Sequence, residues 1–168
     1  RGFFGLVFYY FIIPKKRIKD FYFTKRPLLH LSRCFFGLAA LLSIFTALRN
    51  LPLATVVSIT FAAPIFTTIF SIFFLSEKVG YFRWLAVIVG FIGILIISEP
   101  GFSSLNIYYI FPVIFVLGMS YVAISIRQLS STEPVWLISL FFSAAITIAG
   151  IFTIPFGWLM PSFIDLIL

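Results

Sequence analysis

The feature that most constrains this chain is a succession of long apolar runs, each ended by a proline or a short polar break. A helix needs about 20 apolar residues to cross the hydrocarbon of a bilayer, and a spanning segment must satisfy its own backbone hydrogen bonds. The runs therefore predict an all-α, polytopic transmembrane helix bundle, with the lipid bilayer as its first partner. We expect helices at 2–14, 31–49, 53–75, 82–98, 107–127 and 135–158, with a stub at 162–168.

The composition excludes a water-soluble fold. Of 168 residues, 62% are hydrophobic and 10% are charged, and the mean hydropathy is +1.17. Soluble domains contain roughly 45–50% apolar and about 25% charged residues. The run at 2–14 is too short to span a membrane, so we interpret it as the second part of a longer helix. Pro27 suits the start of the next helix.

The basic residues are sorted by loop, which indicates topology rather than nucleic-acid binding. The formal net charge is +7, and Lys or Arg occurs in the loops at 15–33, 76–83 and 127–134 but not in those at 99–106 and 159–162. Basic loops that alternate with non-basic ones follow the positive-inside rule. We therefore expect the three basic loops to be cytoplasmic, in a multi-pass protein of the inner or plasma membrane with no nucleic-acid partner.

No set of residues suggests an enzyme, a cofactor or a metal. The chain has one histidine and one cysteine, and no Ser/His/Asp set or glycine-rich phosphate loop is visible. We expect His30 at the water interface, Cys34 as a packing residue, and Glu77 in a turn ion pair with Lys78. The sequence thus predicts no catalytic residues, no cofactor and no bound metal.

A polar stripe on the segment 53–75 is the first candidate binding site. Thr60, Pro64 and Thr67 recur at helical spacing, and Pro64 cannot donate to the Thr60 carbonyl, so the helix should kink there. Two interpretations of this stripe are open. It lines a substrate path, or it packs against a neighbouring helix while its hydroxyls form hydrogen bonds with the backbone of their own helix. Tyr121 is the candidate on the facing helix. Arg1 is a further candidate if its helix extends upstream, since an arginine inside a membrane is costly, although it could equally lie at the interface.

Small residues mark expected packing surfaces on other segments. Gly90 and Gly93 with Ala86 offer a surface for close approach of a neighbouring helix. Ser139 and Ser143 lie one turn apart on the segment 135–158. We interpret these as packing seams first and as site residues second.

The order of motifs over 47–101 resembles EamA-type members of the drug/metabolite transporter superfamily. The motifs are Ala-Leu followed by a turn proline, Ala-Ala-Pro in mid-helix, a Leu-x-Glu-Lys turn and a glycine-containing helix. They are carried by Ala47, Leu48, Pro52, Ala62, Ala63, Pro64, Leu75, Glu77, Lys78, Gly90 and Gly93.

The resemblance implies a ten-helix transporter made of two inverted five-helix repeats with a central substrate site. Residues 1–101 would be a truncated first repeat and 102–168 the start of the second. The segments 31–49, 53–75 and 107–127 would line the pocket. Relatives include carriers of S-adenosylmethionine, amino acids and drugs.

Two hypotheses follow from the sequence. The first is a secondary transporter that moves a small polar metabolite, such as an amino acid, a nucleoside-like or a drug-like solute, by alternating access. The second is a structural or assembly membrane subunit that carries nothing. A homodimer is an open alternative for the assembly in either case.

Overall fold

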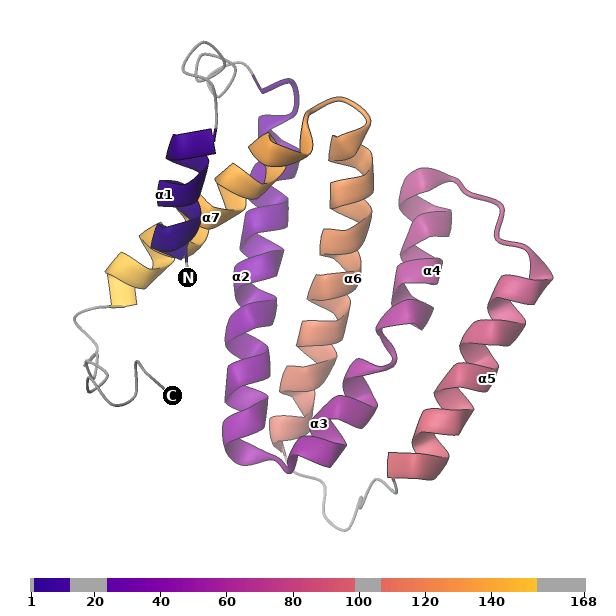
Figure 1. Ribbon diagram of the computed structural model, residues 1–168. Helices are drawn as coiled ribbons and strands as arrows, with labels where there is room; N and C mark the ends of the chain where they lie inside the picture. The colour runs from indigo at the N-terminus through magenta and orange to yellow at the C-terminus, as the bar shows by residue number, and fades with distance from the viewer. Residues whose placement is uncertain (1, 13–23, 99–106, 154–168) are drawn as a thin grey trace.

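The computed structural model describes residues 2–12, 24–98 and 107–153, and throughout these residues the regular structure is helical (Figure 1). The all-α prediction is therefore confirmed. Arg1, most of the first basic loop, the break at 99–106 and the stub at 162–168 lie outside the described residues. The helices are α1 (Gly2–Ile12), α2 (Pro27–Asn50), α3 (Leu53–Thr60), α4 (Ala63–Leu75), α5 (Tyr81–Ser98), the 3₁₀ turn η2 (Ile107–Tyr109), α6 (Ile110–Ser130) and α7 (Val135–Thr153).

Helices α2 and α6 form the centre of the bundle. α2 begins at Pro27, a turn before the apolar run at 31–49, because a proline at the first helical position loses no helical hydrogen bond. The two helices approach closely at Gly118, where an added Cβ would lie 3.0 Å from both the Ala40 Cβ and the Phe36 carbonyl oxygen. Small residues thus bring these two backbones together.

The expected kink in the segment 53–75 is a complete break between α3 and α4. Phe61 and Ala62 form a turn between the helices, and Pro64 lies in the first turn of α4. The Ala63 carbonyl at the break accepts hydrogen bonds from the Thr67 hydroxyl (2.8 Å) and from the Ser120 hydroxyl of α6 (3.1 Å). The break is therefore held against α6 by a hydrogen bond between helices.

The outer helices differ in how much they are packed. α1 lies along α7, and an added Cβ at Gly5 would come within 2.9 Å of the Ser143 hydroxyl (Figure 1). Among the described helices, α5 makes its main contacts with α3 and α4. The expected close approach at Gly90 and Gly93 is wrong for the described residues, since an added Cβ at either glycine would meet nothing within 4 Å.

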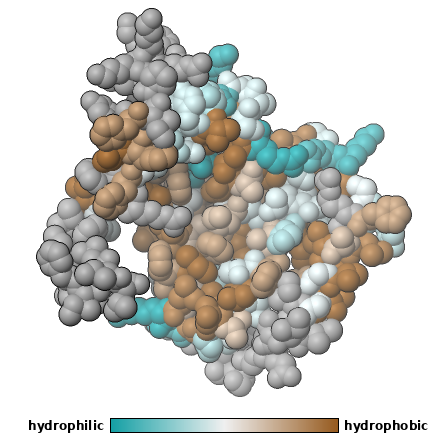
Figure 2. Space-filling model, in the orientation of Figure 1, coloured by the Kyte–Doolittle hydropathy of each residue, from teal (hydrophilic) through white to brown (hydrophobic). Residues whose placement is uncertain are grey.

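The surface is that of a protein embedded in lipid. Four segments are long and apolar enough to cross a membrane within the described residues, namely Pro27–Asn50, Leu53–Leu75, Ile107–Ser130 and Val135–Thr153. Large apolar side chains such as Phe73 and Phe82 are exposed. Figure 2 shows hydrophobic residues across the middle of one face and hydrophilic residues toward its margins.

One end of the bundle gathers three segments that are far apart in the sequence. The start of α2, the α4–α5 connection and the α6–α7 turn lie together at the top of Figure 1. Hydrogen bonds join Thr24 to Glu133, Gln128 to the Phe74 carbonyl, and Arg127 to Glu77. We call this the basic end, because the described parts of the three basic loops meet there.

Candidate functional site

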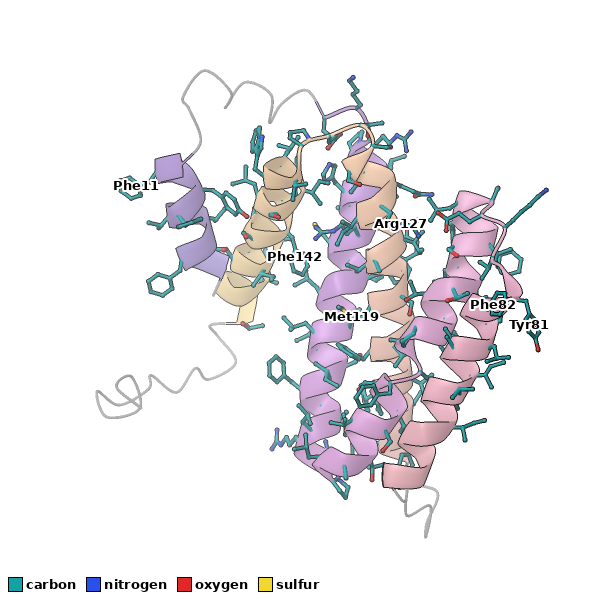
Figure 3. The ribbon with its side chains drawn as sticks, turned by 45° about the vertical axis from the view of Figure 1, so that its right-hand side comes forward. Phe11, Tyr81, Phe82, Met119, Arg127 and Phe142 are labelled. Carbon is teal, nitrogen blue, oxygen red and sulfur yellow. The ribbon has the colours of Figure 1, made fainter. Side chains whose placement is uncertain are left out.

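A cavity of about 570 Å³ lies between α2, α6 and α7. Small-molecule sites usually measure roughly 300–1,000 Å³. Its walls are mostly apolar and aromatic, and they include Gly37, Phe45, Phe115, Met119, Ser139 and Phe142. Figure 3 shows Phe142 of α7 between that helix and α2, with Met119 further along the bundle.

Gly37 of α2 allows α7 to pack beside the cavity. An added Cβ at Gly37 would lie 2.7 Å from a ring atom of Phe142, closer than side-chain atoms normally approach. The Phe142 ring therefore occupies the space that any other residue at position 37 would fill. The cavity wall at this point depends on a glycine in one helix and an aromatic ring in the next.

Among the described residues, Arg33 is the one charged side chain that lines this cavity. The residue is only 6% exposed. Its Nη1 donates to the Ile138 carbonyl oxygen at 3.1 Å, and its Cζ lies 4.9 Å from the centre of the Phe142 ring, close enough for a cation–π interaction. The buried Nε has no hydrogen-bond partner among the described residues.

Both carboxylates in the described part of the chain are engaged elsewhere. At the basic end, the Glu77 carboxylate accepts two hydrogen bonds from the Arg127 guanidinium, of 2.5 Å and 3.3 Å. The prediction that Glu77 pairs with Lys78 is therefore wrong. Local sequence suggested Lys78, but the longer Arg127 side chain crosses from α6. Glu133 pairs with His30. Arg33 therefore has no acidic partner within the described ranges.

The Glu133–His30 pair is buried where the α6–α7 turn meets the start of α2. Glu133 accepts hydrogen bonds from His30 Nε2, from the Thr24 hydroxyl and from the Lys25 backbone N–H, the last at 2.9 Å. Burial by itself would raise the pKa of the Glu133 carboxyl, but the hydrogen bonds from Thr24 and His30, the His30 charge and the Lys25 amide together hold this pKa below its ordinary value.

The prediction that His30 lies at the water interface is wrong. The residue is 2% exposed, its ring packs on Phe141 with 4.4 Å between ring centres, and it bonds a carboxylate 103 residues away. Such a pairing leaves no trace in local sequence. Cys34 is free and buried, in line with its expected packing role.

The residues expected to line a site are dispersed rather than gathered around one point. Thr60 and Thr67 are half-buried and Pro64 is exposed. The Thr60 hydroxyl donates to the Val57 carbonyl and the Thr67 hydroxyl to the Ala63 carbonyl, both at 2.8 Å, as the packing-seam alternative describes. The role of these residues in binding stays a prediction.

Tyr121 joins α2, α4 and α6 near the basic end. Its hydroxyl shares a hydrogen bond of 2.9 Å with the Ser32 hydroxyl, and its ring contacts those of Phe36 and Phe74 at 4.5 Å and 5.8 Å between centres. Tyr121 therefore contacts the far end of α4 rather than the helix break. Arg1, the remaining candidate, lies outside the described residues.

Sequence reasoning missed Arg33 as a site residue because it follows a run of basic residues that topology already explains. One signal could have found it. Arg33 lies six residues after Pro27, which places it in the second turn of the helix rather than before it. Ser139 and Ser143, expected mainly as packing residues, also line the cavity.

The chain matches known transporters over most of its length. A model of the EamA-like transporter family matches residues 1–99. The chain is 31% identical over 151 residues to an S-adenosylmethionine uptake transporter of Rickettsia bellii, covering 86% of this chain and 50% of that protein. It is 28% identical to a riboflavin transporter of Vibrio cholerae, over 79% of this chain and 45% of that protein.

A pseudopaline exporter of Pseudomonas aeruginosa is 29% identical, over 73% of this chain and 42% of that protein. These relatives thus include both an uptake transporter and an exporter. The chain spans about half the length of the curated relatives it matches. No solved structure matches the chain significantly.

Proposed function

Because the chain belongs to the EamA-like transporter family, we propose that it forms part of a secondary transporter that moves a small polar metabolite across the membrane. The relatives named above carry S-adenosylmethionine, riboflavin and pseudopaline, which favours a metabolite rather than an inorganic ion as the solute. The combination of apolar spanning helices and a cavity among them is what such a carrier requires.

The observation that carries the proposal is Arg33 in the wall of the cavity between α2, α6 and α7. A charged group inside a membrane protein is costly and usually marks a substrate or ion pathway. A purely structural subunit has no need of a buried cation that faces an aromatic cavity. This is why we favour transport over the assembly role.

The cavity can form one stretch of a longer path along α2. A second hollow of about 520 Å³ is lined by Phe45, Thr46, Arg49, Asn50 and Tyr108 toward the opposite end of the helix. Phe45 lines both hollows. Arg33 and Asn50 are 17 residues apart, or about 25 Å along an α-helix, a distance close to the hydrocarbon thickness.

We further propose that the basic end is the cytoplasmic gate of this path. The hydrogen bonds of Glu133 join the α6–α7 turn to the start of α2. The pair of Arg127 with Glu77 joins α6 to the segment that follows α4. Breaking them would let these elements separate at one end, as alternating access demands. The break between α3 and α4, with Thr60, Pro64 and Thr67 around it, is a proposed second element of the path.

The test is uptake by cells that express the whole protein, with a radiolabelled panel of amino acids, nucleosides, S-adenosylmethionine and riboflavin. We expect saturable accumulation of at least one solute above vector-only cells, or saturable efflux from preloaded inverted vesicles. A correctly inserted protein that moves no member of the panel in either direction would favour the structural-subunit hypothesis.

A further inference from the structure

The cavity between α2, α6 and α7 holds a positive charge that the described residues do not balance. Arg33 donates to one carbonyl, its Nε is unpartnered, and both described carboxylates are paired with other residues. An uncompensated buried charge is expensive, so it is normally kept only where an opposite charge arrives. A ligand anion is the partner that such a cavity can admit.

The remaining lining limits how much negative charge the ligand can carry. Around Arg33 the walls are made of neutral residues, including the hydroxyls of Ser139 and Ser143 and apolar rings. One guanidinium balances one negative charge, and a dianion would leave a second charge unbalanced in an apolar space. A planar guanidinium also matches the two oxygens of a carboxylate in a bidentate pair.

Aromatic and sulfur-containing side chains define the rest of the ligand. Phe142 contacts the guanidinium face, and Phe45, Phe115 and Met119 line the cavity farther along. Rings and methionine sulfur pack well against flat or apolar groups. The charged group would therefore lie at the Arg33 end and a flat or apolar portion along the rings.

We propose that this cavity binds monoanionic carboxylates that carry an aromatic or apolar portion, with Arg33 as the residue that binds the carboxylate; this inference rests on the transport function proposed above. Snorkelling of Arg33 to water does not explain its position. The guanidinium is buried and turned toward the Ile138 carbonyl of α7, three residues after that helix begins.

The test is calorimetric titration of the purified whole protein with matched acid and amide pairs. The pairs are phenylacetate with phenylacetamide and indole-3-acetate with indole-3-acetamide, and phenyl phosphate is the dianionic arm. We expect at least one acid to bind roughly ten- to hundredfold tighter than its amide, because a hydrogen bond to a charged group contributes about 1.5–3 kcal/mol. Phenyl phosphate should bind more weakly than phenylacetate.

Variants assign the preference to Arg33. Arg33→Gln should abolish the acid preference, and Arg33→Lys should keep part of it, since lysine retains the charge but not the planar fork. Arg26→Gln is the matched control, because Arg26 is exposed at the same end of α2 and its replacement removes the same charge. This control should bind like the wild type.

Thermal unfolding without ligand separates a binding role from a structural one. If Arg33 has no internal acidic partner, Arg33→Gln should unfold at the same or a higher temperature than Arg26→Gln. A lower temperature together with an unchanged acid preference would show that Arg33 is paired with an acidic group of the protein, and the proposal would be overturned. If Arg33→Gln does not fold, the acid preference of the wild type and of Arg33→Lys still tests the proposal.

The remaining outcomes are equally definite. Acids that bind no better than their amides, including no binding by any of them, would overturn the proposal, as would tighter binding of phenyl phosphate. Binding does not require transport, so the two proposals fail separately. Acid-selective binding by a protein that moves no solute of the panel in either direction would count against the transporter only, and transport without acid preference would refute only the carboxylate site.

Discussion

At the scale of single residues, two carboxylates at the basic end have nearly opposite surroundings. Glu133 is buried, with hydrogen bonds from His30, Thr24 and the Lys25 amide. Glu77 pairs with Arg127 where the two side chains are 31% and 53% exposed. Solvent screening makes an exposed pair weak, and burial makes the loss of a partner costly. The two glutamates thus form a matched comparison.

We predict that Glu133→Gln lowers the free energy of unfolding by roughly 1–3 kcal/mol, because the buried His30 loses its ionic partner. Glu77→Gln, the control at the same end, should cost less than about 1 kcal/mol. Chemical or thermal unfolding in detergent measures both. Equal losses in the two variants would contradict the difference in burial.

The pH dependence of stability should also follow Glu133. Its folded pKa lies below the ordinary value of 4.5, so its stabilising contribution is fully present above that pH and is lost as the pH falls through the lowered pKa. The unfolding temperature of the wild type should therefore drop below about pH 4.5. The Glu133→Gln variant should show a flatter profile over the same range, and parallel profiles would refute this assignment.

At the scale of elements, the bundle is held by close packing of small residues at particular crossings. Gly118 meets the Phe36 carbonyl and Ala40, whereas Gly90 on α5 faces open space. We predict that Gly118→Val destabilises the protein by roughly 1–3 kcal/mol through overpacking. Gly90→Val, the same change in an open helix face, should shift the unfolding midpoint little. A neutral Gly118→Val would show that α2 and α6 can separate without cost.

The break between α3 and α4 yields a prediction about movement rather than stability. Pro64→Ala restores the N–H that could bond the Thr60 carbonyl, and Pro64 is exposed, so little packing is lost. We expect near-normal stability and a severalfold slower uptake, because a continuous helix is stiffer at the proposed path. Unchanged uptake rates in cells with equal membrane levels of the protein would exclude the break from transport.

The elements show what the sequence could predict and where it stopped. Apolar runs and the prolines at 27, 52 and 64 are local signals, so they predicted the helices and a kink at Pro64, where the structure has a complete break. The His30–Glu133 pair and the Arg33–Ile138 bond join residues 103 and 105 positions apart, and no local pattern reports such distances. The helices were therefore predicted from the sequence, whereas the cavity with Arg33 in its wall was not.

At the scale of the whole molecule, the basic segments meet at one end, as the positive-inside rule requires of a single cytoplasmic side. Cys34 is the one cysteine in these 168 residues and is buried, so a background with Cys34→Ser and with any cysteine outside these residues replaced allows single thiols to report sidedness. A membrane-impermeant maleimide should label Asn50→Cys in intact cells. It should label Ser131→Cys only after permeabilisation, and the reverse pattern would invert the proposed topology.

The pairing of α1 with α7 has a consequence for the time course of biosynthesis. Gly5 packs against Ser143, a partner that is translated roughly 140 residues later. At about 5–20 residues per second, the ribosome needs roughly 7–28 s to cover that interval. Throughout it, the side of α1 that will face α7 must be covered by lipid, by the insertion machinery or by an earlier helix. The order of synthesis therefore makes the first described helix among the last to reach its final neighbour.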